Sequence, residues 1–341
     1  HDSKVMETEG DCRDVQFTWD MRKTYETIAL EKYNIVGSLS PFSRMAGVDK
    51  KYATVQLNRG CRGQCTFCGV KPFIGNGIRQ TSAELVIQEL DYLVNERKVS
   101  HIEWLDDDLL AKKESAHRIL EHMKRYGEGF SWAANNGLIA ACLDDEALRL
   151  CVESGCVGFR IGVESGNAEI LKKIKKPTSK KILKNFSERL KNYPSLFVTG
   201  CYMIGFENET YGQMLDTFKL SIDLNLSWSG FSIYQKITKE AGVLSEFGDE
   251  GSSDSENLGI RKNTDFVPTK SSMTRSLNGK KLMSYDDLLN LPVDEVHHRD
   301  RLDEIWYAFN LISNYIMNKN LQPGGDPRQF LVWVSALQLT H

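Results

Sequence analysis

The sequence predicts an α/β fold, a partial TIM barrel of six parallel strands in a (β/α)6 arrangement with a mainly helical C-terminal extension. Six short apolar segments with strand-like patterns alternate with five helical segments between residues 52 and 234. Polar residues that begin or end helices stand between these segments. This alternation is typical of parallel βα units joined by right-handed crossovers.

The elements follow one another in a regular order. The expected strands are 52–57, 101–105, 130–134, 157–163, 196–205 and 228–234. The expected helices are 81–97, 113–126, 144–155, 167–191 and 209–224. Thr81 and Glu84 have the spacing of a capping box for the first helix, and Asp144 is expected to open the third.

The chain divides into three regions. Residues 1–50 form a lead-in or linker, residues 51–240 form the barrel core, and residues 241–341 form a linker and a helical region. The acidic, serine-rich segment 245–259 is typical of a flexible linker or surface loop. Residues 301–317 have the pattern of one amphipathic helix, whose aromatic residues are expected in the core.

The composition is that of an ordinary soluble protein. With 41% hydrophobic residues, the 341-residue chain can bury a full core. Its formal net charge of -3 gives no general attraction to nucleic acid or anionic membrane. No apolar run approaches the roughly 20 residues needed to cross a bilayer, so a cytoplasmic location is the default expectation.

Three clustered cysteines give the strongest functional signal. Cys61, Cys65 and Cys68 lie in "NRGCRGQCTFCGV" with the spacing C-x3-C-x2-C. The loop follows the first expected strand, at the end of a barrel where chemistry collects. A structural zinc site normally has four protein ligands, and no second pair of ligands is visible. Three thiolates suit a cluster of four irons better, because they leave one iron open. The other four cysteines that can be interpreted are expected as small core residues: Cys142, Cys151, Cys156 and Cys201.

With these cysteines and Phe67 before the third, the chain resembles the radical S-adenosylmethionine (radical SAM) enzymes. The resemblance covers about residues 50–240 and includes "WLDDDLL", "RIGVESGNAEILKKIKK" and "MIGFENET". It implies a 4Fe-4S cluster whose open iron binds S-adenosylmethionine, and reductive cleavage of that cofactor to a 5'-deoxyadenosyl radical. It also implies an electron donor of the flavodoxin or ferredoxin type.

The resemblance implies cofactor contacts after the second and third strands. Asp107, with Asp106 and Asp108 as alternates, would bind the methionine ammonium group through charge-assisted hydrogen bonds. A surface acid at a strand end is the other interpretation. Asn135, expected after the third strand, would reach the ribose or the carboxylate, unless it is a plain turn residue.

Further contacts are implied near the fourth and fifth strands. Glu164 and Ser165 stand where the family contacts the cofactor. Gly205 would let the backbone approach the adenine closely, with Glu209 beside it or serving only as a helix cap. Arg160 lies within a strand and would face the barrel interior, where it needs an anionic partner.

The subclass is expected to be close to the cobalamin-associated members, and methyl transfer is the expected reaction. No D-x-H-x-x-G cobalamin signature occurs in the sequence. Cobalamin therefore enters only if the chain lacks a preceding domain; otherwise this member works without it. A radical SAM methylthiotransferase or oxidoreductase without cobalamin is one alternative, and a non-catalytic iron-sulfur or zinc-binding module is another.

The pattern favours a small-molecule substrate over nucleic acid. The lysine-rich segment 171–184 would suit phosphate groups, but it also fits a solvated helix face. The sequence does not predict the substrate or the oligomeric state.

Overall fold

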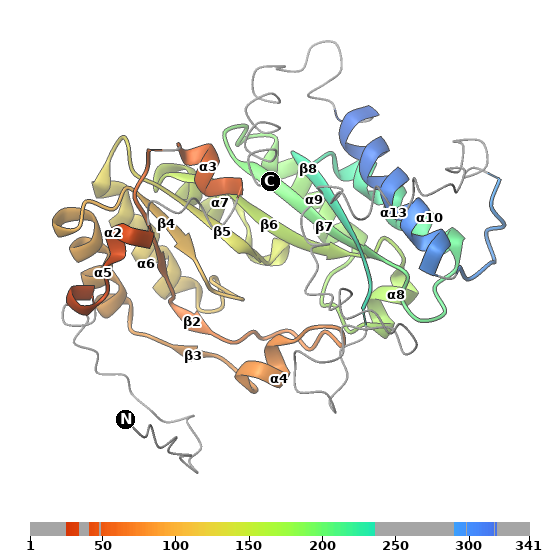
Figure 1. The fold of residues 1–341 in the computed structure, drawn as a ribbon, viewed down its shortest axis with the longest axis horizontal. Coiled ribbons are helices and arrows are strands. Elements are labelled where there is room, and N and C mark those ends of the chain that lie inside the picture. The colour runs from red at the N-terminus through yellow and green to blue at the C-terminus, as the bar shows by residue number, and fades with distance from the viewer. Residues whose placement is uncertain are drawn as a thin grey trace.

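The computed structural model describes residues 25–33, 41–47, 49–235, 290–297, 299–316 and 318. At its centre is a six-stranded sheet in the order β1-β4-β5-β6-β7-β8, and every pairing in it is parallel. Its strands are β1 (Tyr52–Val55), β4 (His101–Trp104), β5 (Ser131–Leu138), β6 (Cys156–Glu164), β7 (Phe197–Ile204) and β8 (Trp228–Ile233). An antiparallel pair, β2 (Asn58–Arg59) and β3 (Arg79–Gln80), flanks the loop after β1. The predicted partial TIM barrel is confirmed (Figure 1).

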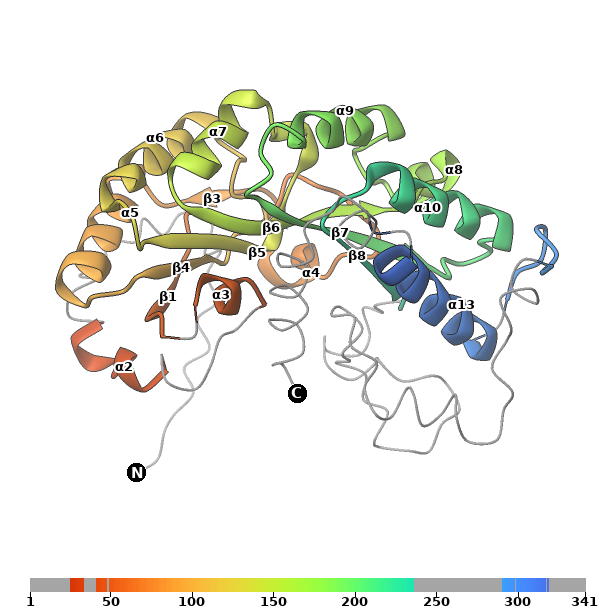
Figure 2. The same cartoon turned by 90° about the horizontal axis from the view of Figure 1, so that it is seen from above.

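Most helices line the outer side of the curved sheet, whereas α2 (Leu30–Tyr33), α3 (Pro41–Ala46) and α4 (Val70–Ile74) lie on the other side, as Figure 2 shows. The first outer helices are α5 (Ala83–Asp91) with a π-helical turn at Tyr92–Glu96, and α6 (Lys113–Met123) with a 3-10 turn at Lys124–Tyr126. A 3-10 turn at Ala140–Cys142 precedes α7 (Asp145–Glu153), α8 (Ala168–Lys173), α9 (Lys180–Leu190) and α10 (Tyr211–Leu224). The helix α13 (Arg299–Leu311), continued by a π-helical turn at Ile312–Ile316, confirms the helix predicted at 301–317. The predicted linker at 245–259 lies outside the described residues.

Local capping agrees with the prediction at one helix and differs at another. The side chain of Asp144 accepts a hydrogen bond from Ala147 N and caps α7 as predicted. The capping box predicted from Thr81 is wrong, because Ser82 caps α5 by accepting from Leu85 N. The backbone N–H of Thr81 is instead bonded to Leu57 O, which ties the start of α5 to the end of β1.

The hydrophobic core fills the space between the sheet and its outer helices. On β7 and β8, Tyr202 stacks on Phe231, whose ring packs against Phe218 of α10 and Phe309 of α13. Alternate residues of the same strands are only half-buried and lie on the inner face, opposite the outer helices. Phe42 of α3 covers the inner face at Gly158, near the start of β6, so the part of this face toward the C-terminal strand ends is the side that remains open to a ligand. No helix in the described part of the chain combines the length and apolarity of a membrane span.

Candidate functional site

The three cysteines lie between β2 and α4, beyond the C-terminal end of β1. Their thiols are free and half-buried, and they line one pocket together with Gly63, Val70 and Lys71. Within the loop, Gly63 N donates to Cys61 Sγ at 3.2 Å, and Cys68 N donates to Cys65 O at 3.3 Å. The loop thus folds back on itself so that all three sulfur atoms face the same small space.

The acidic segment after β4 anchors the entrance to this loop. The fully buried carboxylate of Asp106 accepts from Leu57 N at 3.0 Å and from Asn58 N at 2.5 Å. Burial raises the pKa of Asp106 to about 7, although these two backbone hydrogen bonds act in the opposite direction. Asn58, itself fully buried, donates from its side chain to the backbone oxygens of Asp108 and Leu109. Asp106 therefore holds the chain that leads into the cysteines.

Asp108, two residues after Asp106, holds the cysteine loop itself. Asp108 accepts two hydrogen bonds from the Arg62 guanidinium, at 2.7 and 3.0 Å. Arg62 also donates to Cys142 Sγ at 3.2 Å, which explains why Cys142 is half-buried rather than a core residue. The hydrogen bond with Asp108 raises the pKa of Arg62, so the bidentate ion pair stays charged.

Asp107 differs from both of its neighbours. It is half-buried, and it makes no hydrogen bond or ion pair within the described part of the chain. Burial, followed by the nearby charge of Asp108, raises the pKa of Asp107. Of the three consecutive aspartates, this is the carboxylate that the fold leaves available to a ligand.

A buried ion pair lies at the C-terminal end of β6. Glu164, at a φ of 64°, ends this strand, and its Oε1 accepts from Lys176 Nζ at 2.8 Å. A Cβ atom on Gly162 would stand 2.5 Å from both of these charged atoms. The pair thus lies directly over the backbone of Gly162, and a glycine leaves it the necessary room.

Lys176 reaches this position through the turn that ends α8. Lys175 adopts a φ of 54°, and the backbone N–H of Lys176 donates to Leu171 O at 3.0 Å, as in a Schellman motif. The same helix end accepts from the cysteine loop, through Thr66 N and Ile174 O at 3.0 Å. Burial alone would lower the pKa of Lys176, but Glu164 outweighs it and the pKa is raised. The ammonium group is therefore held as a cation beside the cysteines.

This cation acts on one of the three thiols. Burial raises the pKa of Cys65, and the charge of Lys176 partly offsets that rise. Burial also raises the pKa of Cys61. The sequence interpretation placed Lys176 only within a lysine-rich segment. Its position directly before a proline, where a helix must end, is the signal that separates it from the other lysines of that segment.

Ser165 and Glu209 make hydrogen bonds that hold the turns after β6 and β7. Ser165 is fully buried, and its hydroxyl lies 3.1 Å from that of Thr217 in α10. Glu209 is fully buried as well, and its Oε2 accepts from Gly205 N at 2.7 Å and Phe206 N at 3.0 Å. The N-cap of α10 is Thr210, so Glu209 fixes the preceding turn rather than the helix start.

The conformation of Gly205 is explained by the same turn. Its φ is 79°, and a Cβ atom there would stand 2.8 Å from Leu302 Cδ1 of α13. The sequence predicts that Gly205 lets the backbone approach the adenine closely. In this structure, it is α13 of the same chain that lies close to the backbone there.

Two further predicted residues lie on or beside the inner face. β5 continues to Leu138, so Asn135 lies inside this strand, next to a bulge, rather than after it. Its Oδ1 is buried without a hydrogen-bond partner among the described residues. Arg160 is half-buried and lies beside Thr199 of β7.

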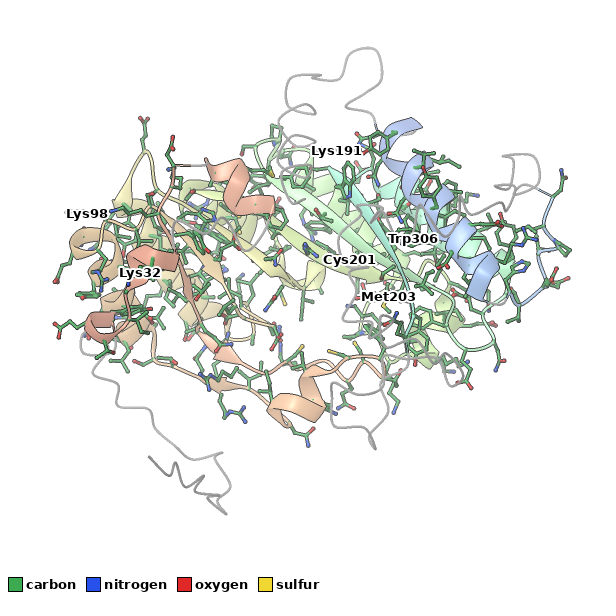
Figure 3. The ribbon with its side chains drawn as sticks, in the orientation of Figure 1. Lys32, Lys98, Lys191, Cys201, Met203 and Trp306 are labelled. Atoms are coloured by element: carbon green, nitrogen blue, oxygen red, sulfur yellow. The ribbon has the colours of Figure 1, made fainter. Side chains whose placement is uncertain are left out.

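Figure 3 shows Cys201 and Met203 along β7, Met203 being nearer to its C-terminal end. Cys151 and Cys156 are buried as predicted, whereas Cys201 is half-buried.

Phe67 joins the cysteine loop to a small apolar cluster at the ends of β7 and β8. Its ring centroid lies 6.2 Å from that of Phe206, which lies 5.0 Å from that of Tyr234. Three buried side chains of the α8 segment complete the cluster: Ile170, Leu171 and Ile174. This cluster thus packs against the cysteine loop through Phe67.

The donor set fits an iron-sulfur cluster. In the described residues, no three His, Cys, Asp or Glu side chains converge so as to hold a single metal ion. Yet three free thiols line one pocket, where burial disfavours a bare thiolate and a bound metal would stabilise it. Sulfur ligands spread around one pocket suit a cluster of several irons better than one tetrahedral zinc ion.

The comparison with protein families agrees with this geometry. Residues 55–220 match the model of the radical SAM superfamily. The match covers just under half of the 341 residues. The matched segment begins at the last residue of β1 and ends within α10, so it contains the cysteine loop and both of the turns described above.

Two curated relatives match part of the chain. An uncharacterized methyltransferase of Pyrococcus horikoshii is 28% identical over 210 residues, which are 62% of this chain and 42% of the relative. The cytidylyl-2-hydroxyethylphosphonate methyltransferase of Streptomyces wedmorensis is 31% identical over 180 residues, 52% of this chain and 32% of the relative. The chain thus spans less than half the length of these two relatives.

A solved structure shows the same fold. The radical SAM methyltransferase TsrM of Kitasatospora setae, solved with cobalamin and a 4Fe-4S cluster, superposes with a TM-score of 0.50. It is 16% identical, and the match covers 60% of this chain and 35% of that one.

Proposed function

We propose that Cys61, Cys65 and Cys68 hold a 4Fe-4S cluster and that the protein cleaves S-adenosylmethionine reductively to begin radical chemistry. The observation that carries the proposal is the gathering of three half-buried thiols around one pocket at the barrel end of a radical SAM domain. When bound, the cluster supplies the cleaving electron at its open iron. A flavodoxin- or ferredoxin-type partner would deliver that electron.

Three residues of the chain would orient the cofactor by charge and hydrogen bonding. Asp107, a carboxylate without a partner in the described residues, would bind the methionine ammonium group. The half-buried ammonium of Lys176 would face the methionine carboxylate, with Glu164 holding it in place. The buried Oδ1 of Asn135 would accept a hydrogen bond from a ribose hydroxyl.

Other residues would keep this arrangement fixed and dry. The bidentate pair between Arg62 and Asp108 holds the cysteine loop against the strand ends. Phe67 and the apolar cluster behind it exclude water from one side. The half-buried inner face of β6–β8 would then receive the substrate, since it opens beneath the same strand ends.

Methyl transfer to a small molecule is the reaction that we propose. Both curated relatives described above are named methyltransferases, and the chain lacks a strong positive charge that would favour nucleic acid. The 341 residues contain no D-x-H-x-x-G segment for cobalamin, so the proposal includes no step through that group.

Anaerobic reconstitution tests the proposal. The wild-type protein should take up about four irons per chain, bind S-adenosylmethionine with a change in the spectrum of the reduced cluster, and release 5'-deoxyadenosine on reduction. Cys65→Ala should lose all three properties. Cys142→Ser is the control, because Cys142 is also half-buried and free but lies outside the triad, and a hydroxyl keeps an acceptor for Arg62. One zinc and no iron per chain would refute the proposal.

A further inference from the structure

The edge of the barrel sheet carries backbone groups that no strand satisfies. β8 is the last strand of the sheet, and in the described structure only β7 pairs with it. The peptide groups of an edge strand that point away from its neighbour are free to bind another strand. In β8 and the residue before it, these groups belong to Ser227, Ser229 and Phe231, whose hydrogen bonds go to α13 and the residues after it. Figures 1 and 2 both show α13 lying along β8.

Asparagine amides on this helix bind the strand in the way a neighbouring strand would. Asn314 Oδ1 accepts from Ser229 N at 2.8 Å, and its Nδ2 donates to Ser229 O at 2.6 Å. Asn310 repeats this exchange with Phe231, at 2.9 Å and 3.3 Å. Two rungs therefore reproduce the paired donor and acceptor of a β-ladder, with side-chain amides in place of a backbone.

A third asparagine and a tryptophan extend the same contact. Asn318 Nδ2 donates to Ser227 O at 3.2 Å. At the other end, Trp306 Nε1 donates to Phe231 O at 2.5 Å; Figure 3 labels this residue on the helix. The helix runs antiparallel to the strand, because residues later in the helix contact residues earlier in the strand.

The amides also use their remaining donors. Asn310 Nδ2 donates to Trp306 O at 3.0 Å, and Asn314 Nδ2 donates to Asn310 O at 3.0 Å, each four residues back along the helix. Both side chains are fully buried. An amide has two donors and one carbonyl acceptor, so every one of these groups is satisfied. A buried amide that met only apolar groups would be costly, so this pattern belongs to a specific contact.

The spacing of the rungs matches the two periods involved. Four α-helical residues rise about 6 Å, close to the rise of about 6.6 Å for two strand residues, although Asn314 lies in the π-helical turn after α13 and Asn318 lies beyond that turn. A rung every four helical residues therefore meets every second residue of the strand. A slip of the helix by one residue would place no amide opposite the free peptide groups.

We infer that Asn310, Asn314 and Asn318 act together as a substitute for a strand, which closes the open edge of the barrel and fixes the position of α13 along β8. This position sets Leu302, two to four turns earlier on the helix, against Gly205 in the turn after β7. This row of asparagines thus protects the edge of β8 from pairing with other chains. It also holds α13 against the turn after β7. The inference does not depend on the proposed chemistry.

Hydrogen-deuterium exchange of the full chain, resolved at single amides, tests the ladder. In the double variant Asn310→Leu/Asn314→Leu, the amides of Ser229 and Phe231 should exchange at least about tenfold faster, since each loses its acceptor. Tyr234 N, which is bonded to Ile204 O on the β7 side, should stay protected. Leucine forms helices better than asparagine and is more apolar, so faster exchange could not come from a weaker helix.

Unchanged protection at both amides in the double variant would overturn the inference, because apolar packing alone would then dock the helix. If that variant does not fold, the single variant Asn314→Leu separates the rungs. It removes the acceptor of Ser229 N and leaves that of Phe231 N in place, so exchange should rise at Ser229 and not at Phe231. Equal effects at both amides, or none, would also overturn it. Asn192→Leu, at an exposed position, is the control.

Discussion

The carboxyl group of Glu209 gives a stability prediction whose size follows from the structure. Burial raises the pKa of Glu209 from 4.5 to about 7, against the opposing effect of its hydrogen bonds from Phe206 N and Gly205 N. At about 1.4 kcal/mol per pKa unit, the ionised form costs about 3 kcal/mol in the folded state. The contribution of Glu209 to the free energy of unfolding should therefore be highest below about pH 4.5 and fall by that amount as the pH rises through about 7.

Glu209→Gln removes this titration while keeping an oxygen for the two backbone donors. Its new NH2 group would take the place of Oε1, which has no partner in the described residues. That costs about 1–3 kcal/mol, but equally at every pH. Between about pH 4.5 and pH 8.5, the variant should therefore gain about 3 kcal/mol relative to the wild type.

Urea unfolding of both proteins at the two pH values measures this difference. Asp106 also has a pKa raised to about 7, but it is present in both proteins and cancels in the comparison. If the two free energies of unfolding changed with pH by the same amount, Glu209 would not be the buried carboxylate described above. If the wild type gained relative to the variant as the pH rose, the sign of the pKa shift would be wrong.

Two other substitutions test the anchors of the site. Asp108→Asn should cost about 1.5–3 kcal/mol in urea unfolding and lower the iron content after reconstitution, because Arg62 loses its bidentate carboxylate. Gly162→Ala should weaken S-adenosylmethionine binding, measured by titration of the reconstituted protein. The new Cβ would displace Glu164 Oε1 and Lys176 Nζ, which end flexible side chains and can move at little cost to the fold.

Neighbouring residues supply the controls for these two variants. Asp107→Asn should change the free energy of unfolding by less than about 0.5 kcal/mol, because Asp107 has no hydrogen bond in the described residues. Gly230→Ala should bind the cofactor as the wild type does, since its Cβ would meet its nearest neighbours at 3.8 Å. Equal losses in the anchor variant and its control would contradict the assigned contact.

The order of strands and helices was predictable because its signals are local. Each strand is an apolar run, and residues such as Asp144 mark where a helix begins. The cysteine loop was predictable for the same reason, since its three cysteines lie within eight residues. The capping box at Thr81 failed because the end of β1 takes its backbone N–H, a contact 24 residues away that the helix pattern does not contain.

The anchors of the site were harder to predict because they depend on turns. The sequence favours Asp107 and keeps Asp106 and Asp108 as alternates. Only the fold shows that these two turn toward the cysteine loop and that Asp107 has no hydrogen-bond partner in the described residues. Lys176 was one lysine among many until the end of α8 turned it onto Glu164. Charge and spacing identify candidates at such places, and backbone geometry decides among them.

The asparagine ladder shows what a helical pattern can conceal. Asn310, Asn314 and Asn318 recur every four residues, on the face where Trp306 and Phe309 are buried. Polar residues on an apolar face normally weaken a packing helix, because each buried amide must find partners. Their regular spacing is therefore the clue: a row of amides on a buried face predicts a row of peptide groups opposite it. Only an edge strand offers such a row, and in this chain that strand lies about 80 residues earlier, as the pairing of Ser229 with Asn314 across 85 residues shows.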